Sequence, residues 1–115
     1  ILPGLEMVAR AMAEQTDLLP LVPYSISDGP PPVVGKSTSA AIESGLFWGA
    51  IGAVREVVNR MSSDVEGDLQ LFLAGGDAEK LSPFLPSTAQ IVPELVLAGI
   101  AITYWQLIRA PKADS

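Results

Sequence analysis

The sequence predicts a helix-rich α/β fold that forms the later part of a larger α/β domain. The expected order of elements is helix, helix, strand, helix, strand, helix, and a pair of strands is too few for a stable sheet of its own. Apolar residues make up 49% of the 115 residues against 17% charged, and the mean hydropathy is +0.37. This apolar share exceeds what a small domain with a large surface needs, so we expect further protein to cover part of the chain.

The first helix is expected within the stretch LEMVARAMAEQT, where apolar residues recur at helical spacing among alanines. Pro3 suits its first turn, because that position has no use for a backbone N–H. Pro20 and Pro23 are expected to end the helix. Residues 21–34 are irregular in character, with a short strand expected near residues 22–26.

A long helix is expected over residues 38–61. Its central stretch is apolar on every side, whereas its last turns carry a polar face, so we expect its first half to be buried. Gly45, Gly49 and Gly52 each cost about 1 kcal/mol of helix propensity relative to alanine. Their presence in a buried helix predicts that another backbone packs closely there.

The last third of the chain alternates strands with helices. The run LQLFLA predicts a buried strand over residues 69–74, and Asp77 is expected to cap a short helix over residues 78–85. The run AQIV predicts a second strand. Pro93 then opens a last helix that ends near residue 109.

The composition excludes several kinds of function. A net charge of −6 argues against a nucleic-acid partner, which draws on clustered Lys and Arg. Without Cys or His, the chain has no disulfide, thiol or imidazole chemistry, although Mg²⁺ remains available because it takes oxygen ligands. No apolar run reaches the roughly 20 residues of a bilayer span, so no membrane partner is expected. The start ILPGLEM has neither Met nor a basic leader, so we expect no signal peptide and a beginning inside a longer protein.

The stretch DGPPPVVGKST ends like a phosphate-binding P-loop, but its register is wrong by one residue and its three prolines lack the N–H groups that such a loop needs. Thr38 has two alternative roles. Its hydroxyl either caps the long helix or holds a polar substrate at the positive helix terminus. Lys36 is expected to be solvated.

The run Gly75-Gly76-Asp77 is open to two interpretations as well. Its glycines serve either the backbone of a strand-to-helix turn, or the close approach of a nucleotide at the carboxyl end of a strand. No two of the carboxylates that could act as a base stand at a catalytic spacing. These carboxylates are Glu6, Glu43 and Glu94.

In their order along the chain, five blocks resemble the C-terminal half of the type III pantothenate kinase family. The family pattern runs Ile-x-Pro-Gly-Leu, Thr-Ala-x-Leu-Pro, Ile-Gly-x-Asn-Thr-x-x-Ala with a Ser-Gly-x-x-x-Gly helix, Thr-Gly-Gly, and Leu-x-Leu-x-Gly-Leu. The blocks are spread over nearly the whole chain. They are ILPGL at 1–5, TDLLP at 16–20, VGKSTSAAIESGLFWGAIGAV at 34–54, LAGGDA at 73–78 and LVLAGI at 95–100.

The resemblance implies an actin-like, ribonuclease-H-like fold of the sugar-kinase and heat-shock chaperone superfamily. Residues 1–110 would be part of the C-terminal domain and residues 111–115 a flexible tail. It also implies a cytoplasmic homodimer that phosphorylates pantothenate from ATP, the first step of coenzyme A synthesis, with Mg²⁺ or a similar divalent ion and a monovalent cation, K⁺ or NH₄⁺. By the family's motifs, Thr38 would contact pantothenate, and Gly75 and Gly76 the nucleotide.

Two residues depart from the family pattern: Ser37 replaces an asparagine and Ala74 a threonine. The family's phosphate loop, catalytic aspartate and cation-binding segment would lie upstream of Ile1. The resemblance therefore implies no catalytic residue and no metal ligand in this chain, and we expect it to be inactive alone. The alternatives are a non-catalytic, dimerising or regulatory relative, and an unrelated helical α/β domain. The coding sequence upstream of Ile1 would separate the first alternative from the kinase.

Overall fold

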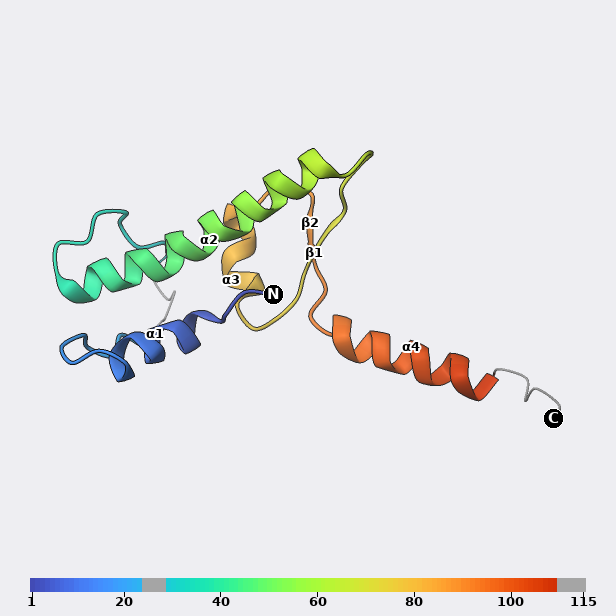
Figure 1. Cartoon of the computed structure of the whole chain (residues 1–115), viewed down its shortest axis with the longest axis horizontal. Helices are drawn as coiled ribbons and strands as arrows, with labels where there is room; N and C mark the ends of the chain where they lie inside the picture. The colour runs from blue at the N-terminus through green and yellow to red at the C-terminus, as the bar shows by residue number, and fades with distance from the viewer. Residues whose placement is uncertain (24–28, 110–115) are drawn as a thin grey trace.

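The computed structural model describes residues 1–23 and 29–109, and within them it confirms the expected order of elements (Figure 1). Most of the strand predicted near residues 22–26 lies outside this range, as does the predicted tail. The chain is a mixed α/β structure with one parallel strand pair. Its elements are α1 (Leu5–Glu14), α2 (Thr38–Asp64), β1 (Leu71–Leu73), α3 (Ala78–Leu81), the 3₁₀ helix η1 (Ser82–Phe84), β2 (Ala89–Ile91) and α4 (Leu95–Arg109).

Helix α1 is found where the periodicity predicts it, but two details of the prediction are wrong. Gly4, with extended backbone angles, occupies the N-cap position, so Pro3 lies before the helix rather than in its first turn. The helix ends at Glu14, well before Pro20, so proline does not end it. Its last turn closes with the N–H of Gln15 donating to the Ala11 carbonyl at 2.9 Å.

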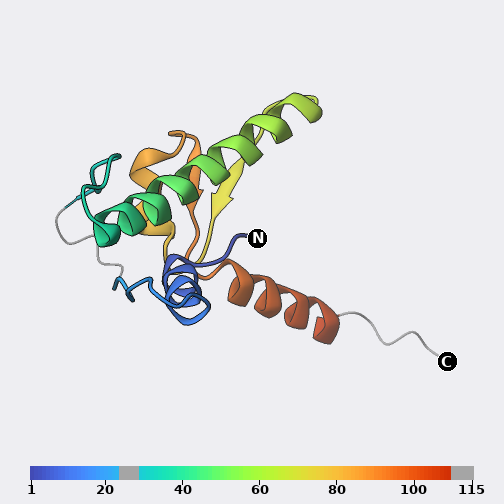
Figure 2. The ribbon, with the colours of Figure 1, turned by 60° about the vertical axis from the view of Figure 1, so that its left-hand side comes forward.

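Helix α2 begins at Thr38, as predicted, and runs to Asp64, three residues beyond the predicted end. All of its buried side chains lie in its first half, from Ile42 to Ile51, which confirms the expected burial. α2 lies against α1 on one side and α3 on another, as the two views of the ribbon show (Figure 1, Figure 2). It is therefore the element around which the chain is organised.

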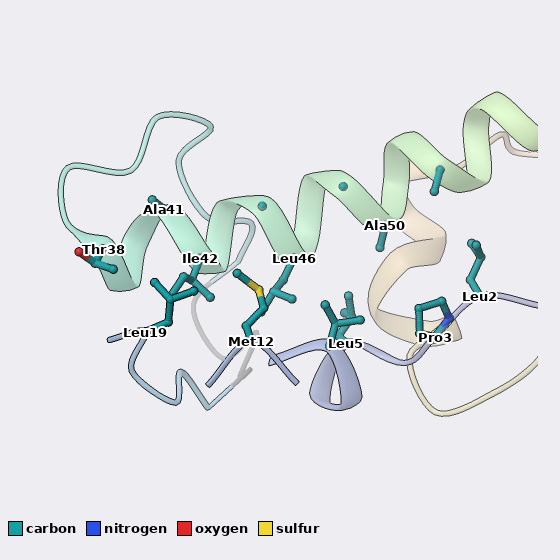
Figure 3. Close-up of a pocket in the computed structure, with 14 residues that line it drawn as sticks. Leu2, Pro3, Leu5, Met12, Leu19, Thr38, Ala41, Ile42, Leu46 and Ala50 are labelled. Carbon is teal, nitrogen blue, oxygen red and sulfur yellow. The ribbon is translucent and has the colours of Figure 1, made fainter. Parts of the chain in front are cut away.

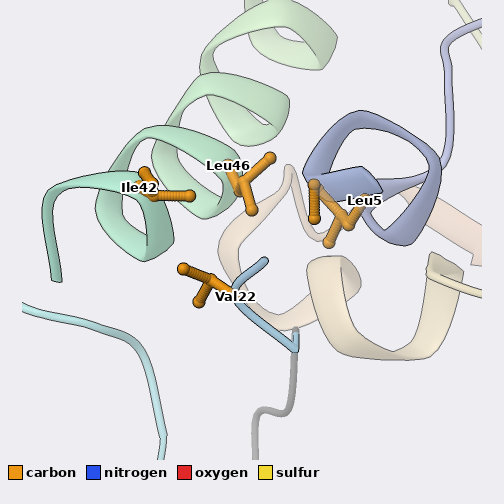
Figure 4. Close-up of a cluster of buried hydrophobic side chains, with 5 residues drawn as sticks. Leu5, Val22, Ile42 and Leu46 are labelled. Atoms are coloured by element: carbon orange, nitrogen blue, oxygen red, sulfur yellow. The ribbon is translucent and has the colours of Figure 1, made fainter. Parts of the chain in front are cut away.

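Two small apolar clusters lie on different sides of α2. The first joins α2 to α1 and to residue 22; it consists of Leu5, Ala9, Val22, Ile42 and Leu46 (Figure 4). The second joins α2 to the turn after α3 and consists of Phe47, Ile51 and Leu85. Its rim is aromatic, because Phe47 meets Trp48 and Phe84 edge to face at centroid distances of 4.9 and 5.0 Å.

The parallel pairing of β1 with β2 confirms the two predicted strands, with Leu71 opposite Ala89 and Leu73 opposite Ile91. The prediction of a buried strand is wrong, because Phe72 at the centre of β1 is 47% exposed. The pair contains only three residues per strand. Within the described residues no further strand or helix covers that side chain.

The expected close packing at the helix glycines is not made by the described residues. A Cβ placed on Gly45, Gly49 or Gly52 would meet no atom within 4 Å. The tight approach occurs instead at Gly35, where a Cβ would lie 2.3 Å from the backbone nitrogen of Ala41. The low helix propensity of the three helix glycines can be recognised in the sequence. The close contact of Gly35 with Ala41 cannot, because it depends on how the loop before α2 folds back.

Helix α4 extends away from the rest of the chain and has no buried side chain (Figure 1). The radius of gyration is 19.1 Å, against about 13 Å for a compact domain of this length. The accessible surface of 8896 Å² is about half as much again as a folded monomer of this mass exposes. The apolar surplus of the sequence is therefore found on the surface, and nine of the 21 exposed large apolar side chains of the described residues lie on α4.

Candidate functional site

A groove with a volume of about 760 Å³ lies between α2 and α1 (Figure 3). Thr38 stands at one end of it and Pro3 lies toward the other end. Among the described residues that line it, Thr38 alone carries a polar side chain. The other lining residues are Leu2, Pro3, Leu5, Val8, Met12, Leu19, Ala41, Ile42, Gly45, Leu46, Gly49, Ala50 and Ala53.

Thr38 is the first residue of α2 and is exposed. The N-cap role belongs to Ser37, whose hydroxyl accepts from the N–H of Ala40 at 3.2 Å. Of the two alternative roles of Thr38, the capping role is therefore wrong by one residue, because the extended backbone of Ser37 is the geometry that an N-cap requires. Within the described part of the chain the Thr38 hydroxyl makes no hydrogen bond, so it is free to meet a ligand.

The loop before α2 is fixed by side chains of the helix. The Ser44 hydroxyl donates to the Val33 carbonyl at 2.7 Å, and Trp48 Nε1 donates to the Pro31 carbonyl at 2.9 Å. Prolines offer no N–H, but their carbonyls remain acceptors. With Gly35 packed on the first turn of α2, these bonds hold the loop in one position beside Thr38.

A second hollow of about 460 Å³ lies at the carboxyl end of β1 and is lined by Gly75 and Gly76. Gly75 has φ +106°, a conformation that favours glycine, and its carbonyl accepts from the N–H of Ala78 at 3.1 Å to close the turn. A Cβ on either glycine would meet no atom within 4 Å. The positive φ at position 75 thus explains why a glycine stands there. At position 76 the missing side chain leaves open space at the hollow.

Asp77 does not cap its own helix, contrary to the prediction. It stands at the N-cap position of α3, but its backbone angles are helical and its side chain makes no capping bond there. Instead its Oδ2 accepts from the N–H of Leu5, the first residue of α1, at 2.9 Å. Its Oδ1 lies 3.3 Å from the Nζ of Lys80. Sequence reasoning missed the bond to Leu5 because the two residues are 72 positions apart.

The groove and the second hollow adjoin each other. They share the lining residues Leu2, Pro3, Leu5 and Ala50. Thr38 lines only the groove, whereas Gly75 and Gly76 line only the second hollow. The structure therefore brings the three predicted site residues to neighbouring cavities with a common wall rather than to one cavity.

The other candidates lie on the surface. Glu6 pairs with Arg10 at 2.9 Å on α1, and Glu43, Glu94 and Lys36 are exposed. In residues 1–23 and 29–109, no three acidic side chains lie together in a way that could hold a metal ion. Over the same residues, none of the helices has the length and apolar character needed to cross a membrane.

A parallel strand that ends at a glycine turn, next to an apolar groove with one free hydroxyl, is typical of a small-molecule-binding α/β protein. Comparison with known proteins gives the family. The sequence model of the type III pantothenate kinases matches residues 1–60, which is about half of the chain. The chain belongs to the type III pantothenate kinase family.

Individual relatives agree with this assignment. The chain is 37% identical over 103 residues to a type III pantothenate kinase of Legionella pneumophila, and 31% identical over 105 residues to one of Nitrosococcus oceani. A third, from Syntrophotalea carbinolica, is 34% identical over 104 residues. These alignments cover 88–90% of the chain but only 37–40% of each relative. The chain thus spans well under half the length of these curated relatives.

Proposed function

We propose that the chain is the C-terminal, ligand-positioning part of a pantothenate kinase that transfers the γ-phosphate of ATP to pantothenate, the first step of coenzyme A synthesis. One observation carries the proposal. The residues that match the family's substrate and nucleotide motifs, Thr38 and Gly75-Gly76, line two adjoining cavities with a common wall. Phosphoryl transfer depends on holding two ligands next to each other, and adjoining cavities suit that task.

The groove suits the apolar part of pantothenate. The dimethyl-substituted carbon next to its reacting hydroxyl is an apolar group, and the groove walls are aliphatic. The Thr38 hydroxyl would bond one polar group of the substrate at the positive end of α2. Pantothenate also carries a carboxylate and an amide, for which this lining has no side-chain partner. We expect those partners to come from protein outside the groove.

The glycine turn suits the nucleotide. Open space at Gly76 allows a large planar or phosphorylated group to approach the backbone, as ligands do at the carboxyl ends of strands in α/β sheets. ATP would supply the phosphoryl group. Among the described residues no acidic cluster fits Mg²⁺. Other parts of the protein would therefore bind the divalent ion and the monovalent cation. They would also supply the base that orients the attacking hydroxyl.

The two departures from the family pattern have different weight. Ser37 caps α2, and serine and asparagine are both strong N-cap residues, so this replacement preserves the start of the helix. Ala74 lines the second hollow without a hydroxyl, so the nucleotide would lose one bonding partner there. On this reasoning the kinase activity is retained, and the affinity for the nucleotide is lowered.

The proposal includes the actin-like, ribonuclease-H-like fold and the homodimer of the family. The short strand pair would extend into a larger sheet, and exposed α4 would be covered, when the remaining domain and the second protomer are present. The chain alone supplies positioning without a base, so we expect it to be inactive. Turnover of ATP and pantothenate by the purified 115-residue chain would contradict this expectation.

The test uses the full-length protein with Thr38→Val, which keeps the shape and removes the hydroxyl, and Thr38→Ser as the matched control. The KM for pantothenate should rise roughly 3- to 10-fold in Thr38→Val, as expected for one lost hydrogen bond, and stay near the wild-type value in Thr38→Ser. The KM for ATP should not change in either variant. An unchanged pantothenate KM in Thr38→Val would refute the substrate assignment, and a full-length wild type without turnover would favour the non-catalytic relative.

A further inference from the structure

We propose that Asp77 is a positioning residue for the nucleotide: its carboxylate holds the start of α1 as one wall of the hollow beneath Gly75-Gly76. The inference rests on the proposed function, because it takes Gly75 and Gly76 as the nucleotide side. It goes further by naming the group that fixes the width of that site. Asp77 acts through Leu5 rather than by touching the ligand.

The bond itself is well suited to this role. Leu5 opens α1, so its N–H has no partner inside the helix and needs one from elsewhere. Asp77 Oδ2 supplies that partner at 2.9 Å, and its negative charge lies at the positive end of the helix. The Asp77 side chain is only 26% exposed, so water competes for it less than at an open surface.

The carboxylate does not cap its own helix. α3 is a single turn of four residues, and Asp77 makes no capping bond to it, although its Oδ1 lies 3.3 Å from the Nζ of Lys80 in that turn. Its other oxygen, Oδ2, reaches across to residue 5 and connects the glycine turn with the beginning of the chain.

The part of this wall that precedes Leu5 has little other support. Residues 1–5 line the second hollow, and Leu5 is buried in the first apolar cluster. Before Leu5 the segment loses that support, since Leu2 is 48% exposed and Ile1 is fully exposed. Gly4 passes close to Asp77, because a Cβ there would lie 3.5 Å from Oδ2. Without the carboxylate, the position of this segment relative to Gly75-Gly76 is set less firmly, by the burial of Leu5 alone among the contacts named above.

The experiment compares three variants of the full-length protein: Asp77→Ala, Asp77→Asn and, as a matched control, Glu79→Ala, which removes an exposed carboxylate from the same short helix. Asp77→Ala should raise the KM for ATP about tenfold, the effect of losing one charge-assisted hydrogen bond. The KM for pantothenate should rise less than the KM for ATP, because Leu2, Pro3 and Leu5 line both cavities whereas Thr38 lies only in the groove. Asp77→Asn keeps an oxygen that accepts from Leu5 and should restore most of the ATP affinity. Glu79→Ala should behave as wild type.

Several results would overturn the inference. An unchanged KM for ATP in Asp77→Ala would show that Asp77 does not position the nucleotide. Equal rises in the KM for ATP and the KM for pantothenate would show that Asp77 has only a general structural role. If Asp77→Ala does not fold, the Asp77→Asn variant tests the inference instead. Its amide oxygen can still accept from Leu5, so a rise of about tenfold in its KM for ATP would contradict the proposed role of that oxygen. If the wild-type protein itself binds no ATP, the proposed function fails and the inference with it. That outcome is recognised without any variant.

Discussion

Replacing Gly35 by alanine is predicted to be the most damaging single-methyl change in the described chain. The added Cβ would lie 2.3 Å from the nitrogen of Ala41 and 2.5 Å from its Cα, whereas Cβ contacts below 3.0 Å are essentially absent from proteins. Both atoms belong to the backbone of α2, so no flexible side chain can move aside. The loop or the helix start must shift by about 1 Å, which costs about 1–3 kcal/mol by the measure of overpacked sites.

The shift would also disturb neighbouring bonds. Ser37, two residues after Gly35, caps α2, and Val33, two residues before it, accepts from Ser44. Movement large enough to relieve the clash loosens one of these bonds, and each is worth about 1 kcal/mol. The total expected loss is therefore about 2–4 kcal/mol, a large fraction of the stability of an ordinary domain.

The matched control is Gly52→Ala. Gly52 lies within α2, outside both cavities, and its added Cβ meets no atom within 4 Å. The same methyl group should here stabilise the protein by about 1 kcal/mol through helix propensity. Urea unfolding of the full-length protein followed by circular dichroism measures both, with unchanged m-values as evidence that only stability has changed. A Gly35→Ala protein as stable as wild type would refute the steric reasoning.

Three further predictions follow from single contacts. Ser37→Ala should lower the free energy of unfolding by about 1 kcal/mol, while Ser37→Asn should leave it nearly unchanged, as urea unfolding would show. Trp48→Phe, which keeps the ring and removes the donor to Pro31, should cost about 1 kcal/mol in the same assay. Gly75→Ala should cost about 1–2 kcal/mol because of its positive φ, whereas Gly76→Ala should leave stability within about 0.5 kcal/mol of wild type. Equal costs at the two glycines would contradict the distinction between them.

The order of elements was predictable from the sequence because it depends on local patterns. The apolar run of α2 is long enough to mark a helix on its own, and the short runs before and after α3 are bounded by glycine and proline. The helix start at Thr38 was predicted as well. The cap was misassigned by one residue, since serine and threonine are both good caps and only the backbone angles of Ser37 decide between them.

The contacts that shape the candidate site were not predictable from local patterns. Nothing near Asp77 indicates that its partner is Leu5, 72 positions away. The contact of Gly35 with Ala41 spans only six positions, but it depends on how the irregular loop before α2 folds back. The pattern of Gly45, Gly49 and Gly52 suggested a close neighbour that the described residues do not supply. A resemblance to a family helped where local patterns could not, by selecting Thr38 and Gly75-Gly76 from many exposed polar or small residues.

The protrusion of α4 gives the protein two tryptophans in opposite surroundings. Trp48 is partly buried and packed against Phe47, whereas Trp105 is 52% exposed on α4 with the Arg109 guanidinium 3.6 Å from its ring centroid. Their fluorescence therefore reports separate events. In a Trp48→Phe variant of the 115-residue chain, Trp105 is the only remaining tryptophan, and a blue shift of its emission would mark the moment at which α4 leaves water for an apolar contact.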